Sequence, residues 1–200
     1  MGTEGQLEDL NKEIRKCIKC SLAETRINAI CGEGNPHAKL LLIAQAPGKN
    51  EDKEGRMFIG PSGKVLDNLF KRSKIDRKEI YMTNLVKCML PKYRRPKSGE
   101  IKICSEYLDW EIELINPLML VSLGYYASRY LFNKYDLPLP FKKEFGGVYG
   151  KVFDADNKKL IPLQHPAAIL YNRSLEESIA RNYQKMQVLF VSFFGKDGCM

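Results

Sequence analysis

The sequence predicts an α/β fold in which helices cover both faces of a parallel sheet. Four short apolar runs, at residues 39–44, 79–83, 118–123 and 159–164, have the length and continuous hydrophobicity of buried parallel strands. Between them lie longer segments whose apolar residues recur at helical spacing. Strands that alternate with helices in this way pair in parallel, because each connection crosses back over the sheet.

Each helix has its own pattern. The expected helices lie at residues 6–16, 63–73, 99–115, 125–133 and 174–194. The last one has capping-box spacing at its start, in Ser174-Leu175-Glu176-Glu177. Trp110, in the third helix, is assigned to packing. Residues 134–158 are the least clear segment, and a hairpin of 145–149 with 151–153 is one interpretation.

Length and composition favour a single domain over residues 1–200, expected to be a cytoplasmic monomer. Hydrophobic residues make up 44% of the chain, which is enough for a sizeable core. No apolar run approaches the roughly 18 residues of a membrane span, and the start of the chain lacks a secretory pattern, so no membrane partner is expected. Lys plus Arg (32) exceed Asp plus Glu (24) by eight. This balance suits a polyanion such as nucleic acid, or simple solubility.

Four of the six cysteines form two separated pairs. The pairs are Cys17 with Cys20, in a CxxC, and Cys88 with Cys104, which lie 16 positions apart (104 minus 88). Disulfides do not suit a cytoplasmic chain, and thiolates from two distant pairs can close around Zn²⁺ or an iron–sulfur cluster. Spacing alone does not separate these metals. A redox-active or merely buried CxxC is the other interpretation.

Polar side chains follow three of the predicted strands at the point where each ends. Gln45 opens the turn Gln45-Ala46-Pro47-Gly48, Asn84 follows the second strand, and His165 follows the fourth. The carboxyl ends of parallel strands meet at one edge of a sheet, where α/β proteins bind ligands. We therefore expect one pocket there, with Phe58 from the loop after the first strand. Each feature also has a plainer interpretation. The loop after the first strand could simply join strand to helix, and Asn84 could be a turn residue. His165 could be structural, and Phe58 could belong to the core.

In their order along the chain, these segments resemble the family-4 uracil-DNA glycosylases, the iron–sulfur type found in thermophilic bacteria and archaea. AQAPGKNED with GRMFIGPSGKVLD resembles the family's first motif, whose usual form is GEAPGxxED followed by GxPFVGxAGxxLD. Later family segments are matched by TNLVKC, by CSEYLDWEIELINP with LVSLG, and by HPAAIL. The similarity extends from Cys17 to about Asn172, and the combination is specific although each short motif is weak.

The resemblance implies a three-layer α/β/α sandwich around a central four-stranded parallel sheet. It implies a structural [4Fe-4S] cluster whose ligands are Cys17, Cys20, Cys88 and Cys104, with Cys31 and Cys199 as free thiols. The cluster is expected to brace a DNA-facing loop over residues 89–103. The cations of that loop are Lys92, Arg94, Arg95 and Lys97. They are expected to contact phosphates, which provide affinity rather than sequence choice; a solvated loop is the plainer interpretation.

The resemblance also implies how uracil would be held after it is flipped out of DNA. Phe58 would stack on the base, and the amide of Asn84 would pair with O4 and N3–H. His165, neutral or charged, would donate an N–H to O2, where negative charge develops as the glycosidic bond breaks. Backbone N–H groups near Ala46, in the turn with Pro47, would bind the pyrimidine oxygens. The residues expected to enter the minor groove are Leu170, Tyr171 and Arg173.

One departure from the family pattern concerns Gln45, which stands where the family usually has Glu. An amide cannot act as a general base or oppose a cationic sugar with charge, although it can orient water. Glu51 or Asp52 are the candidates for that electrostatic role. Ala44 likewise stands where the family has Gly.

The main hypothesis is a monofunctional uracil-DNA glycosylase acting in DNA repair, with uracil-containing DNA as its partner. No lysine is evident as a Schiff-base nucleophile, so no lyase activity is expected. The alternative is a protein of the same fold that binds DNA or a modified base with weak, altered or no activity, because Gln45 replaces the usual Glu. A redox iron–sulfur or zinc protein is a third hypothesis, and it leaves the pocket motifs unexplained.

Overall fold

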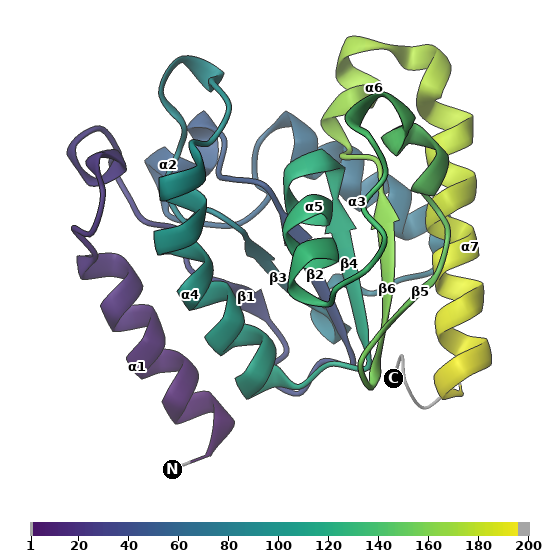
Figure 1. Cartoon of the computed structure of the whole chain (residues 1–200), viewed down its shortest axis with the longest axis horizontal. Helices are drawn as coiled ribbons and strands as arrows, with labels where there is room; N and C mark the ends of the chain where they lie inside the picture. Colours follow the sequence, from purple (N-terminus) through teal and green to yellow (C-terminus); the bar gives the residue numbers. More distant parts are fainter. Residues whose placement is uncertain (1, 196–200) are drawn as a thin grey trace.

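The computed structural model describes residues 2–195, which form an α/β fold built on one mixed sheet (Figure 1). Within those residues the strand order is β1-β3-β2-β4-β6-β5. The strands are β1 (Glu33–Gly34), β2 (Leu40–Ala44), β3 (Tyr81–Asn84), β4 (Met119–Leu123), β5 (Phe153–Ala155) and β6 (Lys158–Leu163). The four expected strands are β2, β3, β4 and β6, and they pair in parallel as predicted. The two additional strands, β1 and β5, pair antiparallel at the edges.

Seven α-helices surround this sheet in the described part of the chain. They are α1 (Thr3–Lys16), α2 (Lys49–Glu54), α3 (Pro61–Ser73), α4 (Ser98–Ile115), α5 (Gly124–Lys134), α6 (Ala167–Tyr171) and α7 (Glu176–Phe194). The five expected helices correspond to α1, α3, α4, α5 and α7. Among the residues described, no helix is both long and apolar enough to cross a membrane.

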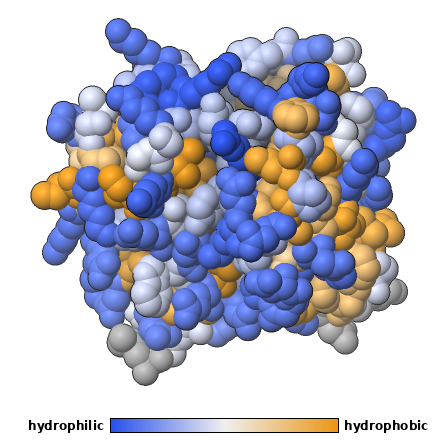
Figure 2. Space-filling view, viewed as in Figure 1, coloured by the Kyte–Doolittle hydropathy of each residue, from blue (hydrophilic) through white to orange (hydrophobic). Residues whose placement is uncertain are grey.

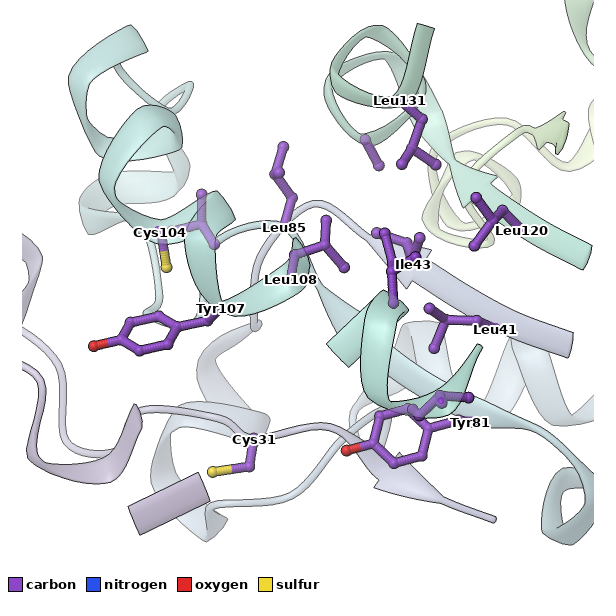
Figure 3. Close-up of a cluster of buried hydrophobic side chains, with 14 of the residues drawn as sticks. Cys31, Leu41, Ile43, Tyr81, Leu85, Cys104, Tyr107, Leu108, Leu120 and Leu131 are labelled. Carbon is purple, nitrogen blue, oxygen red and sulfur yellow. The ribbon is translucent and has the colours of Figure 1, made fainter. Parts of the chain in front are cut away.

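The expected three layers are confirmed, because helices cover both faces of the sheet (Figure 1). Successive residues of a strand point to opposite faces. Leu41 and Ile43 of β2 pack in one core with α1, α4 and α5, whereas Leu40 and Leu42 pack in the other with α3 and α7. Figure 3 shows the first core, in which Cys104 and Tyr107 of α4 lie at one end. The buried apolar residues thus fix the sheet between two helical layers.

Two local predictions were wrong. Ser174 does not cap α7: it lies in a 3-10 turn (Arg173–Leu175), where the Asn172 side chain accepts its backbone N–H at 3.0 Å. Glu177, expected to complete the box, instead pairs with Arg72 at 2.9 Å. Trp110 does not pack in the core, since it is 55% exposed. In the first case, hydrogen bonds and an ion pair with other side chains replace the expected cap.

Two other segments also differ from expectation. Residues 49–54, expected as part of a loop, form α2. In the unclear segment, Lys142–Val148 form a 3-10 helix, and the hairpin lies later, between β5 and β6.

Candidate functional site

A cavity of about 340 Å³ opens at the carboxyl ends of the parallel strands, and we call it the edge cavity. Its lining includes Gln45, Ala46, Pro47, Gly48, Glu51, Met57, Phe58, Ser62, Asn84, Leu90, Tyr93, Arg94, Leu123, Gly124, His165, Ala167 and Tyr171. The expected convergence of Gln45, Asn84, His165 and Phe58 on one pocket is therefore confirmed as geometry.

The strand register explains this convergence. Ala44 of β2 lies opposite Asn84 of β3, and Leu123 of β4 lies opposite Leu163 of β6. The ends of the four strands therefore present Asn84, Gln45, Gly124 and His165 in a row. Gly124 has a φ of +80°, and a Cβ there would lie 3.5 Å from the His165 Cβ. Glycine at this position lets the chain turn tightly into α5 beside the histidine.

Phe58 is held in a strained conformation. Its φ of 52° is unusual for a non-glycine residue, and the side chain is buried. Arg77 donates to the carbonyls of Met57 and Phe58 at 2.6 and 3.3 Å. A Cβ at Gly63 would lie 1.8 Å from the Phe58 carbonyl oxygen, so only glycine fits there. A strained backbone conformation that its neighbours hold in place is typical of a ligand-binding position. In this conformation the centroid of the Phe58 ring lies 6.2 Å from that of the His165 ring.

Asn84 is the buried polar side chain at the end of β3, only 2% exposed. Its Nδ2 donates to the thioether sulfur of Met57 at 3.0 Å. Sulfur is a weak acceptor, so a ligand carbonyl can replace it at little cost. Asn84 thus presents a donor and an acceptor from a rigid strand end.

His165 is set up as a neutral hydrogen-bond donor. Its Nδ1 accepts the backbone N–H of Ala167 at 3.1 Å. Burial lowers the pKa of His165 to about 4, so the imidazole is uncharged near neutral pH. In a neutral imidazole only one nitrogen bears a proton, and an accepting Nδ1 leaves that proton on Nε2.

The two acidic candidates on α2 have different environments. Glu51 lines the edge cavity and accepts the Gly60 backbone N–H at 2.7 Å. Asp52 is not part of that lining, and its carboxylate accepts the backbone N–H groups of Ile27 at 3.1 Å and Asn28 at 3.3 Å. Of the pair, Glu51 alone lines the cavity, whereas Asp52 ties α2 to the loop at residues 27–28.

The basic loop after β3 forms one wall of the edge cavity. Arg94 lines the cavity, and its guanidinium binds both carboxylate oxygens of Glu100, at 2.8 and 2.5 Å. This partner lowers the pKa of Glu100 and neutralises much of the arginine's charge. Exposed cations beside the cavity are Lys92, Arg95, Lys97 and Arg173. Leu170 is 50% exposed, and the exposed ring of Tyr171 lies at the cavity mouth.

The four paired cysteines surround a second, smaller cavity, the cysteine cavity. The cysteines in its lining are Cys17, Cys20, Cys88 and Cys104. They come from the end of α1, from the connection after β3 and from α4. Arg26 donates to the Cys88 sulfur and the Lys87 backbone N–H to the Cys104 sulfur, each at 3.1 Å. Donors directed at sulfur are what metal-bound thiolates require.

Burial raises the pKa of the Cys104 thiol to about 12, so a thiolate there needs a cation in the cavity. In residues 2–195, no three Cys, His, Asp or Glu side chains lie close enough to hold a single metal ion. The four thiols that line the cavity are a donor set used by zinc sites and by iron–sulfur clusters. Cys31 is buried away from this cavity, with its sulfur 3.5 Å from the Asn11 carbonyl, and Cys199 lies outside the described residues.

A buried charged network joins the two cavities. The ammonium of Lys87 and the carboxylate of Glu111 are 2.6 Å apart, and their side chains are 2% and 0% exposed. Thr83 completes the network, with its hydroxyl 2.6 Å from Lys87 and 2.7 Å from Glu111. Thr83 precedes Asn84 and Lys87 precedes Cys88, so the network links the edge cavity to the cysteine cavity.

Sequence reasoning missed several residues of the edge cavity. Met57, Ser62 and Tyr93 lie in loops or at a helix start, where no periodic pattern indicates direction. Leu123 and Gly124 could have been found, because they end a predicted parallel strand as Gln45 and Asn84 do. Arg77, which holds Phe58, gives no signal in the sequence.

The fold and this strand-edge site define a known class of protein. A model of the uracil DNA glycosylase superfamily matches residues 31–189, and the chain belongs to that superfamily. Within it, the chain falls among the type-4 uracil-DNA glycosylases.

Three curated relatives of that type are similar over most of their length. The chain is 38% identical to the type-4 uracil-DNA glycosylase of Sulfurisphaera tokodaii, over 93% of this chain and 86% of the relative. It is 39% identical to that of Saccharolobus solfataricus, over 90% and 85%. For Thermotoga maritima the identity is 34%, over 98% of both chains.

Proposed function

We propose that this protein removes uracil from DNA as a monofunctional glycosylase, leaving an abasic site. The observation that supports this most strongly is that a neutral His165 and a buried Asn84 line the same cavity. Asn84 can read the base edge, and Nε2–H of His165 can bind the oxygen on which charge develops. The family membership supports the same activity.

In the proposed reaction the bond between C1′ and N1 breaks, and its electron pair moves into the uracil ring toward O2. The Nε2–H of His165 stabilises that anion without transferring its proton. The oxygen of a water molecule bonds to C1′, and the water loses one proton to solvent. Gln45 orients the water through its amide. The carboxylate of Glu51 opposes the positive charge on the sugar.

Binding before this step uses the remaining lining. Phe58 stacks on the flipped base, and backbone N–H groups in the turn of Ala46 and Pro47 bind its oxygens. The residues proposed to contact DNA are Arg94, Arg95, Lys97, Leu170 and Arg173. Because Arg94 already binds Glu100, it contributes chiefly by fixing the loop, while Arg95 and Lys97 contact phosphates.

We further propose a [4Fe-4S] cluster bound by Cys17, Cys20, Cys88 and Cys104. The four sulfurs, the donors directed at two of them and the burial of the cavity support this assignment. When bound, the cluster supplies a cross-link between α1, the connection after β3 and α4, and no step of the reaction passes through it. Elemental analysis that found one zinc and no iron per chain would exclude it.

Residues 1–200 are also proposed to form a single domain, and the protein to be a monomer; sedimentation analysis of the purified protein would test the oligomeric state.

The deciding experiment measures release of free uracil from a labelled oligonucleotide that contains one uracil. Asn84→Ala should abolish release and His165→Ala should slow it by about 10²–10³-fold, whereas Asn68→Ala and His37→Ala, matched changes at exposed positions, should leave it unchanged. Release that survived both site variants would show that the site is wrong. Tight binding of uracil-DNA without any release by the parent protein would favour the binding-protein alternative.

A separate variant tests Gln45, because the amide at this position is the feature that favours the binding-protein alternative over the glycosylase. Gln45→Glu places a carboxylate beside the sugar and should raise the single-turnover rate if Gln45 limits the reaction. An unchanged rate would mean that Glu51 already supplies the needed charge.

A further inference from the structure

A second large hollow lies between α4 and α5, away from both sites described above. It has a volume of about 660 Å³, and we call it the helix groove. Its lining is Pro96, Ser98, Ile101, Lys102, Ser105, Tyr126, Arg129, Tyr130, Asn133 and Lys134. It shares no residue with the edge cavity or the cysteine cavity.

The two helices face the groove with matching stripes. On α4 the lining residues are Ser98, Ile101, Lys102 and Ser105, at positions i, i+3, i+4 and i+7, and on α5 they begin at Tyr126 with the same spacing. Neighbouring helices normally fill such stripes with apolar side chains that interlock. Here the stripes are mostly polar and leave a hollow between the helices, which Asp109 of α4 bridges to Tyr130 and Lys134 of α5. Figure 2 shows that hydrophilic residues dominate this face of the molecule.

The lining is positively charged. It contains Lys102, Arg129 and Lys134, and it includes no acidic residue in the part of the chain described. Lys134 is partly neutralised by Asp109, which lies behind it at 3.1 Å. Lys102 and Arg129 are both exposed to solvent. Two exposed cations on neighbouring helices suit the phosphates of an extended polyanion.

Aromatic rings add a second kind of contact. Tyr126 and Tyr130 are half-buried in the groove, and the hydroxyl of Tyr130 is anchored to Asp109 at 2.6 Å. Grooves that combine cations with aromatic rings are how proteins follow unpaired nucleic acid, since rings stack on bases whose faces are free. A duplex does not expose those faces.

The groove continues the proposed DNA-binding surface. Tyr93 and Arg94 line the edge cavity, and Pro96 and Ser98, only a few residues later, line the helix groove. The loop over residues 89–97 is therefore a wall of both. A strand whose base occupies the edge cavity can cross this loop into the groove.

We propose that the helix groove binds an unpaired DNA strand that flanks the excised base. This proposal rests on the proposed glycosylase function. It assigns to α4 and α5 a role in recognising single-stranded substrate beyond the lesion itself.

The test uses the charge-reversal variant Lys102→Glu/Arg129→Glu. Its matched control, Lys78→Glu/Arg181→Glu, changes one exposed lysine and one exposed arginine elsewhere and alters net charge equally. Binding of uracil-free single strands of about 6 and about 30 nucleotides, of the longer strand paired with its complement, and of a free mononucleotide is followed by fluorescence anisotropy at several salt concentrations. Uracil release from a short substrate is measured in parallel, and thermal unfolding verifies that each variant folds. Lys102→Met/Arg129→Met removes the charges without reversing them, should the first variant unfold.

We expect the groove variant to lose about tenfold in affinity for the long strand and to keep the parent's affinity for the short one. Loss of two phosphate contacts should reduce the salt slope by about 1.4. The control variant should match the parent in both. Equal losses in both variants, a loss confined to fully paired DNA, or binding of a free mononucleotide with no effect of strand length would each overturn the proposal. Because the binding assay needs no uracil, it distinguishes failure of the groove from failure of the glycosylase function.

Discussion

The edge cavity and the cysteine cavity lie on either side of the connection after β3, yet they are stabilised in different ways. In the edge cavity the protein's own bonds fix two key positions: Arg77 holds the backbone of Phe58, and the Ala167 N–H holds the side chain of His165. The cysteine cavity has thiols with raised pKa values in apolar surroundings, and its two pairs come from segments distant in sequence. A site that exchanges its ligand at every turnover must be formed in advance, whereas a site that keeps its cofactor can be completed by it.

The strongest test of this contrast removes one cysteine. Cys88→Ser should abolish metal binding and lower the free energy of unfolding by about 5 kcal/mol or more, since cofactor binding and folding are coupled. The matched change Cys31→Ser, at a buried cysteine outside the cavity, should keep the metal. Iron content and thermal unfolding of the two variants provide the measurement. Full metal content in Cys88→Ser would contradict the ligand assignment.

The network between the cavities gives the next largest effect. Lys87→Met should lower the free energy of unfolding by about 3–5 kcal/mol, because it leaves the Glu111 carboxylate buried without its cation. Adding Glu111→Leu should restore most of that loss. Chemical denaturation of the single and double variants gives both values. If the double variant were as unstable as the single one, the unpaired charge would not be the cause.

A substitution in the edge cavity is expected to lower the rate of uracil release without lowering the stability of the fold. His165→Ala should slow single-turnover uracil release by about 10²–10³-fold, the usual result of removing one donor to a developing anion. Its melting temperature should stay close to that of the parent, in contrast to Cys88→Ser. A fall in melting temperature as large as for the cysteine variant would mean that His165 is structural.

The smallest effect concerns pH. The folded pKa of His165, about 4, lies below its ordinary value of 6.5, so the unfolded chain takes up the proton first. This residue should therefore reduce stability as pH falls from about 6.5 to about 4, with no effect above that window. The release rate should show no histidine titration between about pH 5 and pH 8. A rate that changed with an apparent pKa near 6.5 would contradict a neutral donor held by burial.

Much of the fold was predictable because strands that are buried on both faces consist of continuous apolar residues. The runs at 40–44, 119–123 and 160–163 are apolar on both faces of the sheet, which favours central strands. The edge strand β1 has two residues, too few for a pattern. The helix α2 was not predicted because its six residues are all polar or charged. Its buried residues are the acids Glu51 and Asp52, so no apolar face indicates a helix. Tertiary hydrogen bonds, which the sequence does not display, hold it in place.

The part of the site that lies at strand ends was also predictable. Strand ends indicated Gln45, Asn84 and His165, since topology alone brings them together. Which of Glu51 and Asp52 lies in the cavity was not predictable, because adjacent helix positions differ by about 100° in direction and the helix itself was unexpected. The pairing of Arg94 with Glu100 likewise depends on how the loop folds back on α4.

The 1.8 Å approach between a Cβ at position 63 and the Phe58 carbonyl has a practical consequence for protein engineering. Mutant libraries that aim to change which base is accepted should leave position 63 as glycine, because every other residue would displace the backbone of Phe58, whose ring is proposed to stack on the base. Met57 and Ser62, which line the same cavity, are the positions to vary instead.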